Sequence, residues 1–198
     1  MTIMEKKRLL SLIIILMILV VIIGAILLSV DDPKQITANE GYILANKVMN
    51  ETHTTYYLYR IQNNMMETYE DGKSTGWSYG YLFEGNNETF HYKRVEIYSN
   101  GSYISYDLPG TTSSLDKLIQ NWSIDSDAAY KIAASNPAIN SFINSPSCSF
   151  FGSYMIQING TTQWCFSWNK AGILDDPKWA DINIDATTGE VLYVEVDD

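Results

Sequence analysis

The stretch IDSDAAYKIAASN, residues 124–136, decides the fold prediction because an earlier stretch of the chain repeats it. ITANEGYILANKV, residues 36–48, aligns with it at a constant offset of 88 residues. Tyr42 falls on Tyr130, and in both copies an isoleucine precedes the first polar residue. A repeat of this kind predicts that the chain contains two similar units.

Both copies carry the signals of a helix start. Thr37 is a candidate N-cap, and Glu40 three residues later completes a capping box. In the second copy Asp125 takes the capping position, and Asp127 adds a negative charge in the first turn, where the helix dipole favours it. Pro137 disfavours a helical conformation in the residue before it, so we expect the second helix to end near residue 136.

The repeat continues in segments that alternate between the two faces of a strand. GWSYGYLF, residues 76–83, lies over QWCFSWNK, residues 163–170, at an offset of 87. VEIYSNGSYISYDL, residues 95–108, matches INIDATTGEVLYVEV, residues 182–196, and each contains a glycine at an expected hairpin turn. Alternation of this kind predicts antiparallel strands with one buried face.

These patterns predict the fold class and the domain organisation. We expect an α+β fold with an N-terminal transmembrane helix followed by two tandem modules, each a helix packed on a small antiparallel β-sheet. A single domain is the alternative. The expected parts are a cytoplasmic basic tail at 1–8, a transmembrane helix at 9–30, a first module at 31–108, a linker at 109–121 and a second module at 122–198.

The N-terminal segment indicates the compartment. A basic cluster, Lys6 to Arg8, precedes Leu9–Val30, which holds 22 residues without a charge. At about 1.5 Å per residue this segment is long enough to cross a bilayer core. A cleaved signal peptide is the alternative, but its apolar region is usually shorter. The basic cluster favours a cytoplasmic N-terminus, so we expect a single-pass cell-membrane protein whose C-terminal part is extracellular.

The charge of the remaining chain excludes one class of partner. When Glu5, Lys6, Lys7 and Arg8 are left out, ten basic and 22 acidic residues remain, a net charge of −12. Nucleic acids and anionic lipid surfaces are poor partners for such a chain. Leu9–Val30 therefore provides the expected contact with the membrane, and the other expected partner is a protein.

Two further features agree with an extracellular location. The candidate N-glycosylation sites are Asn50, Asn87, Asn100, Asn121 and Asn159. Cys148 and Cys165 are the two cysteines of the chain, and outside the cell we expect them to form a disulfide. Two buried thiols are the alternative for this pair.

The acidic cap and alanine-rich face of IDSDAAYKIAASNP, together with INIDATTGEVLYV, resemble the PepSY domain family. The residues that match the family motif are Asp185, Thr188, Gly189 and Glu190. The resemblance covers residues 122–198, whereas residues 36–108 keep a glycine but lack the Asp and Thr-Gly-Glu signature. The family has no catalytic residues to carry over. The resemblance implies a protein that binds or restrains other proteins, proteases among them.

A calcium site is one alternative reading of the C-terminal strands. Asp181, Asn183 and Asp185 have the spacing of calcium-loop ligands, but Ala186 stands where such a loop needs glycine. Ile182 and Ile184 alternate with these polar residues, which is typical of a strand with one solvated face. We therefore predict no metal ligands and no cofactor.

The remaining residues favour binding over catalysis. His53 and His91 read as separate surface or sheet histidines, and no nucleophile, zinc or phosphate-binding motif accompanies them. We predict a non-catalytic binding protein of the cell envelope, not an enzyme, with a secreted or membrane protease as a candidate partner. A structural or glycan-binding envelope protein is the alternative, since tyrosine-rich strands such as YGYLF and YISYD also fit a sugar-binding platform.

Overall fold

The structure, a computed structural model, describes Met17 and residues 34–64, 69–85, 89–170 and 178–197. Residues 35–198 form one compact unit. Apart from Met17, the predicted membrane-spanning segment lies outside the described residues. No helix within the described residues combines the length and the apolar character that crossing a membrane requires.

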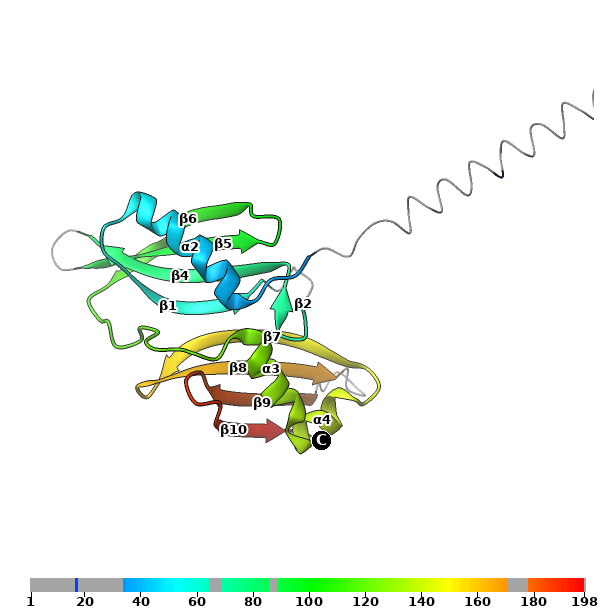
Figure 1. The fold of residues 1–198 in the computed structure, drawn as a ribbon. Helices are drawn as coiled ribbons and strands as arrows, with labels where there is room; N and C mark the ends of the chain where they lie inside the picture. The colour runs from blue at the N-terminus through cyan, green and yellow to red at the C-terminus, as the bar shows by residue number, and fades with distance from the viewer. Residues whose placement is uncertain (1–16, 18–33, 65–68, 86–88, 171–177, 198) are drawn as a thin grey trace, which may run out of the picture. The chain divides into compact units, whose positions relative to one another are not determined.

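The elements follow one another in nearly the same order in each half of this unit (Figure 1). The first half contains α2 (Ala38–Thr52), β1 (Tyr56–Asn63), β2 (Tyr69–Glu70), β3 (Lys73–Ser74), β4 (Gly76–Glu84), β5 (Phe90–Tyr98) and β6 (Tyr103–Thr112). The second half contains α3 (Ser126–Ser135), α4 (Pro137–Ile143), β7 (Cys148–Ile158), β8 (Thr161–Lys170), β9 (Lys178–Asp185) and β10 (Val191–Val196).

The predicted fold class is wrong, because the strands do not form two separate sheets. Eight of the ten described strands form one antiparallel sheet in the order β10-β9-β8-β7-β1-β4-β5-β6, and β2 and β3 pair only with each other. The first strand of each half pairs with the other, at Ile61 with Met155 and at Gln62 with Tyr154. This pairing satisfies backbone groups that two separate sheets would leave on open edges. Pro109, the first residue of the predicted linker, belongs to β6.

The two predicted helix starts are confirmed. The Thr37 hydroxyl accepts a hydrogen bond from the Glu40 amide at 3.3 Å, and the Glu40 carboxylate accepts one from the Thr37 amide at 2.8 Å. The Asp125 carboxylate accepts from the Ser126 amide at 2.7 Å. α3 ends at Ser135 as expected, but Pro137 then begins α4, a helix that the sequence patterns missed.

The N-termini of α2 and α3 are bonded to one another. The amide of Ala38 donates to the Ser126 hydroxyl at 3.0 Å, and the amide of Asn39 donates to the Asp125 carboxylate, also at 3.0 Å. Asp125 therefore satisfies free amides at the starts of two helices from different halves. The first turns of the two halves are parts of one hydrogen-bonded structure.

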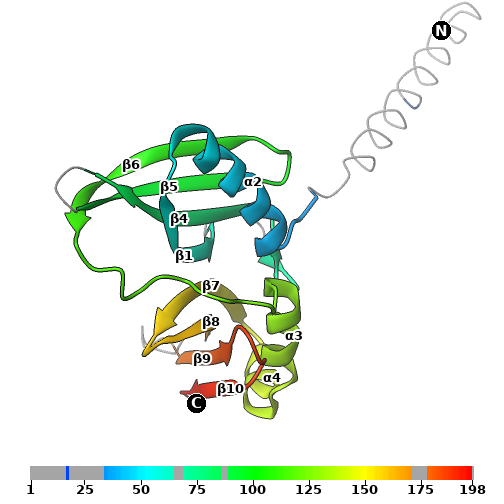
Figure 2. The ribbon, with the colours of Figure 1, turned by 60° about the vertical axis from the view of Figure 1, so that its left-hand side comes forward.

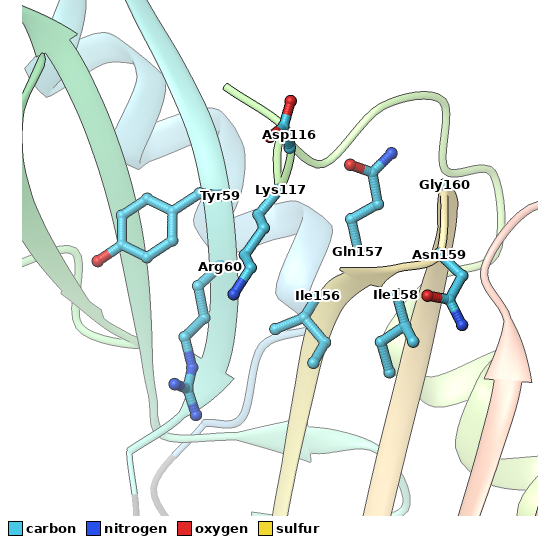
Figure 3. A pocket seen from close by; sticks show the side chains of 9 residues that line it. All are labelled: Tyr59, Arg60, Asp116, Lys117, Ile156, Gln157, Ile158, Asn159 and Gly160. Carbon is cyan, nitrogen blue, oxygen red and sulfur yellow. The ribbon is translucent and has the colours of Figure 1, made fainter. Parts of the chain in front are cut away.

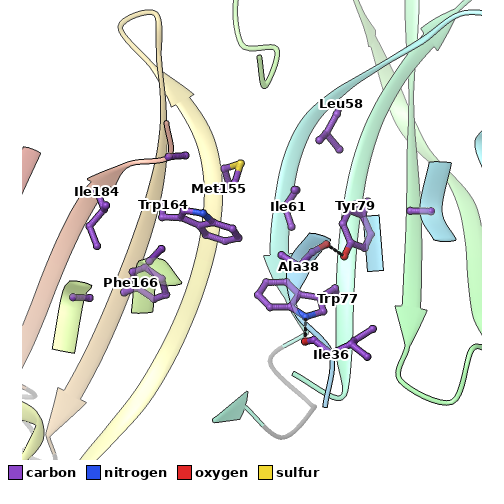
Figure 4. Packing of buried hydrophobic residues seen from close by; sticks show 14 of the residues in the cluster. Ile36, Ala38, Leu58, Ile61, Trp77, Tyr79, Met155, Trp164, Phe166 and Ile184 are labelled. Carbon is purple, nitrogen blue, oxygen red and sulfur yellow. Dashed lines mark hydrogen bonds between the residues drawn. The ribbon is translucent and has the colours of Figure 1, made fainter. Parts of the chain in front are cut away.

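All three described helices lie against one face of the sheet (Figures 1 and 2). The aromatic residues of β4 that point to this face, Trp77, Tyr79 and Tyr81, are fully buried. The Tyr79 hydroxyl donates to the Ala38 carbonyl at 2.6 Å (Figure 4). Gly41 makes this approach feasible, because a Cβ atom there would lie 2.2 Å from the Tyr79 hydroxyl oxygen. YGYLF therefore belongs largely to the core.

The short β2–β3 hairpin joins the halves on the helical side of the sheet. Tyr69 stacks on Phe150 with ring centroids 4.0 Å apart. At the turn of the hairpin, Gly72 has a φ of +81°, and a Cβ atom there would lie 2.4 Å from the Ser126 carbonyl oxygen. Beside the hairpin, the buried side-chain oxygen of Asn63 accepts from the Ser153 amide at 2.6 Å. These contacts connect the β1–β4 loop to the second half.

Candidate functional site

The face of the sheet opposite the helices is the surface that the fold leaves available. Successive side chains of a strand point to opposite faces, so Leu82 lies on the other side from Tyr79 and Tyr81. None of the described helices covers this side (Figure 2). We call it the open face; its described side chains include Tyr59, Arg60, Leu82, Tyr92, Arg94, Tyr106, Tyr154, Ile156, Ser167 and Asp181.

The open face is interrupted where the two halves meet. β1 and β7 are registered at two residue pairs and then separate, as Figure 3 shows. The segment between β6 and α3 passes this opening, and the Ile119 amide donates to the Leu58 carbonyl of β1 at 2.9 Å. On the other side the Thr162 hydroxyl donates to the Gln120 carbonyl at 2.8 Å. The connecting segment is therefore attached to both halves.

A groove of about 710 Å³ lies between β1, β7 and the connecting segment (Figure 3). We call it the seam groove; it is lined by Tyr59, Arg60, Asp116, Lys117, Ile156, Gln157, Ile158, Asn159 and Gly160. Two smaller hollows of about 250 and 420 Å³ share lining residues with it, Arg60 in one case and Tyr59 with Lys117 in the other. The hollows therefore adjoin the seam groove along the open face.

The seam groove combines positive charge with aromatic surface. The Arg60 guanidinium lies over the ring of Tyr154, 5.3 Å from its centroid. Tyr59 meets Tyr92 edge to face with ring centroids 5.5 Å apart, and burial raises the pKa of Tyr59. Arginine and aromatic side chains are enriched at the centres of protein interfaces.

One carboxylate also lines the seam groove. Asp116 lies on the connecting segment, and its carboxylate accepts a hydrogen bond from the Ser114 hydroxyl at 2.7 Å. The lining therefore carries two cations, Arg60 and Lys117, against this one anion. The local excess of positive charge contrasts with the net charge of −12 over the chain that follows the N-terminal segment.

Sequence reasoning missed the seam groove. Its lining comes from β1, from the connecting segment and from the end of β7, which lie far apart in the chain. No local motif links Arg60 with Lys117. The segments that carry the lining residues come together only because β1 pairs with β7. The only signal in the sequence is the small number of basic residues in an acidic chain.

The predicted disulfide is absent from the structure. Cys148 and Cys165 are both free thiols, and the strand register places Cys148 opposite Lys170 and Cys165 opposite Tyr154. At about 3.4 Å per residue these positions are much farther apart than a disulfide allows. Cys165 is a buried thiol, and burial raises its pKa to about 12. The alternative of two buried thiols holds for Cys165, whereas the Cys148 thiol is half-buried.

The candidate glycosylation sites are spread over the surface. Asn50 lies in α2, Asn100 and Asn159 lie at hairpin turns, and Asn121 lies on the connecting segment; all four are exposed. Asn87 lies outside the described residues. Asn159 also lines the seam groove, so a glycan there would stand at the edge of the open face.

The residues of the family motif form a tight turn between β9 and β10. The Asp185 carboxylate accepts from the amides of Thr187 and Thr188 at 2.7 and 2.8 Å, and these hydrogen bonds lower its pKa. Gly189 has a φ of +80°, which a glycine adopts readily. The backbone of Glu190 completes the turn, because its carbonyl accepts from the Asp185 amide at 2.8 Å. These residues shape the turn.

The C-terminal strands show no grouping of calcium ligands. The Asp181 carboxylate accepts from the Ser167 hydroxyl, and the Asn183 amide group donates to the Gln163 side chain at 3.3 Å. Asp185 is used in the turn. Within the described ranges, no three His, Cys, Asp or Glu residues form a group that could hold a metal ion.

Both histidines contact the same aromatic ring. His53 and His91 contact Phe83 with ring centroids 4.1 and 5.5 Å away, respectively. Burial and the positive charge of Lys93 lower the pKa of His53, while Asp107 acts in the opposite direction. The sequence placed these histidines in separate strand-like regions and did not predict that they would meet at Phe83.

Comparison with known proteins identifies a similar fold but no family. No family model matches the chain, and no curated protein matches it. The fold is similar to the crystal structure of a candidate lipoprotein from Clostridium difficile 630, with a TM-score of 0.50 and 14% identity over 79% of this chain and 93% of the other. At this identity the likeness concerns the fold alone. The resemblance to the PepSY family stays a prediction.

Proposed function

We propose that this protein is a non-catalytic binding protein of the cell envelope that uses its open face to engage a protein partner. The apolar segment Leu9–Val30 would hold it at the cell membrane in a single pass, with the N-terminus in the cytoplasm and residues 35–198 outside. Membrane association agrees with the similarity of the fold to that of a candidate lipoprotein. A secreted or membrane protease is a candidate partner, as the PepSY resemblance implies.

The observation that carries this proposal is the seam groove on an uncovered sheet face. Tyrosine and arginine are the residues that most often dominate the binding energy of protein interfaces. Here Tyr59, Arg60 and Tyr154 meet at a concave part of the open face. A concave surface also excludes water from the contacts that a partner makes, which strengthens them.

Glycan binding is the second candidate function. The observation that favours it is the exposure of β6, where Tyr103 keeps 52% of its surface and Tyr106 keeps 37%. Exposed aromatic rings can stack on sugars as well as on proteins. This candidate places the contact at the edge of the sheet, whereas protein binding uses the seam groove.

Direct capture separates the two candidates. The purified full chain, held in lipid nanodiscs, is exposed to the secreted and envelope proteins and to the envelope glycans of its own cell. Each captured protein is then purified and tested for saturable binding, and the rate of any captured protease is measured with and without the full chain. A partner that binds directly supports the proposal. Retention of glycan without any direct protein partner would replace it with the second candidate.

A further inference from the structure

We infer that the seam groove binds an extended acidic segment of a partner protein, a segment that alternates carboxylate and apolar side chains. This inference rests on the proposed function and adds the chemistry of the ligand. It follows from three features of the groove, namely its backbone, its charge and its apolar side.

The backbone around the seam groove favours an extended ligand. β1 and β7 are registered only at Ile61 and Gln62, so the sheet is open beyond these pairs. The connecting segment already uses this opening, since the Ile119 amide donates to the Leu58 carbonyl at 2.9 Å. An extended ligand can lie over this seam on the open face, with β1 on one side of it and β7 on the other. Its alternate side chains can then point toward the two strands.

The charge of the seam groove favours a carboxylate. The ion pairs formed among the described residues are Lys93–Asp107, Lys131–Asp127 and Lys178–Asp197, and none of them uses Arg60 or Lys117. Arg60 presents a planar group that binds a carboxylate with two hydrogen bonds, and Lys117 lines the same groove. The two cations can therefore bind acidic side chains of a ligand.

The third feature is apolar. Ile156 and Ile158 lie two positions apart on β7, so they share one face of the strand, and both are half-buried. Figure 3 shows them on the β7 side of the groove, with Arg60 and Lys117 on the other side. An extended segment that alternates acidic and apolar residues directs its acidic side chains to one side and its apolar side chains to the other. In the groove the acidic side chains can face the two cations, and the apolar side chains can face the two isoleucines.

The test uses the full chain in nanodiscs of uncharged lipid. Calorimetry measures the binding of a short capped peptide that alternates glutamate and leucine, of the same peptide with glutamine in place of glutamate, and of an oligogalacturonate as an anionic glycan. The test variant is Arg60→Gln with Lys117→Gln. The matched control, Lys47→Gln with Lys73→Gln, removes the same charge from exposed positions on α2 and β3.

The expected result is saturable binding of the acidic peptide that weakens as salt is added. The test variant should bind it about three- to tenfold more weakly, and the control variant should bind it like the original chain. The glutamine peptide should also bind more weakly. Unchanged melting temperatures of both variants would show that the fold is intact.

Three results would overturn the inference. These are no binding of the acidic peptide, equal binding by the test and control variants, and preference of the groove for the oligogalacturonate. The proposed function is tested separately. A purified envelope partner that binds the test variant as tightly as the original chain would contradict only the assignment to the groove, whereas the absence of any direct partner would contradict both.

Discussion

The indole rings of Trp77 and Trp164 contact one another across the junction of the two halves, with centroids 6.1 Å apart and planes at 67°. Each occupies the equivalent place in its own half. The Trp77 indole N–H donates to the Ile36 carbonyl, and the Trp164 indole N–H donates to the Ile124 carbonyl, both at 2.8 Å. The two tryptophans that the sequence repeat aligns therefore contact each other where the two halves join into one sheet.

Replacing Trp164 should therefore destabilise both halves together. Trp164→Phe removes the indole N–H and leaves the Ile124 carbonyl without its donor, so we expect a loss of about 2 kcal/mol in the free energy of unfolding. Urea unfolding followed by fluorescence and by circular dichroism should give one shared transition. Trp179→Phe, on the open face, is the matched control and should cost much less. Two separate transitions would show that the halves unfold independently.

Asp125 should contribute more than an ordinary N-cap. Its carboxylate accepts from the amides of Ser126 and Asn39, so Asp125→Ala removes a hydrogen-bond acceptor from two helix starts. We expect a loss of about 1–2 kcal/mol, and a smaller loss for Asp125→Asn, because asparagine also caps helices well. Thr37→Ala, which affects the start of α2 alone, is the comparison in the same urea titration. A smaller cost for Asp125→Ala than for Thr37→Ala would contradict this account.

Alanine substitutions at two glycines distinguish the cost of backbone strain from the cost of a steric clash. Gly189 and Gly160 have φ values of +80° and +83°, so an alanine at either position is strained by about 1–2 kcal/mol. A Cβ atom at residue 189 would also lie 3.0 Å from Ile124 and 3.1 Å from Ile132, whereas nothing lies within 4 Å at residue 160. Gly189→Ala should therefore lower the melting temperature more than Gly160→Ala. Equal decreases in the melting temperature would show that the methyl group at residue 189 does not clash with its neighbours, one of which lies on α3.

His53 should make the fold less stable in mild acid. Because its pKa is lowered in the folded protein, the unfolded chain binds a proton more readily in the window below the ordinary pKa of 6.5. Stability should therefore fall as the pH decreases from 7 toward 5, and His53→Gln should flatten this part of the curve. Asp185 affects the stability of the fold at lower pH. Its pKa is lowered in the folded protein, so its contribution to stability is lost only as the pH falls and the carboxylate is protonated. Thermal unfolding of the original chain and of His53→Gln across pH 2–8 covers both windows, and identical slopes of the two proteins between pH 7 and 5 would exclude a role for His53.

Local signals predicted the elements, and long-range pairing decided their assembly. The capping residues Thr37 and Asp125 act through neighbouring amides, so the sequence indicated both helix starts correctly. Pro137 was read only as a stop, but Asn136 caps a new helix there by accepting from the Ala138 amide at 3.1 Å. The same proline therefore follows the end of one helix and begins the next.

The joining of the halves had no local signal. Whether β1 pairs with β7 depends on contacts such as the one between Trp77 and Trp164, which are far apart in the chain. The same pairing creates the seam groove, so the candidate site could not be predicted before the sheet was known. The disulfide prediction failed for a related reason, because the expected extracellular location of the two cysteines indicates nothing about the strand register that separates them.

The central claim is that the open face is the binding face, and crosslinking tests it most directly. A photoreactive amino acid is placed at Ile156, which lines the seam groove on the open face, or at Ile43, which is 64% exposed on α2. Both full-length chains are irradiated with a partner that has been shown to bind directly. We expect a crosslinked product from residue 156 and none from residue 43. Crosslinking from residue 43 alone, or equally from both, would contradict the account.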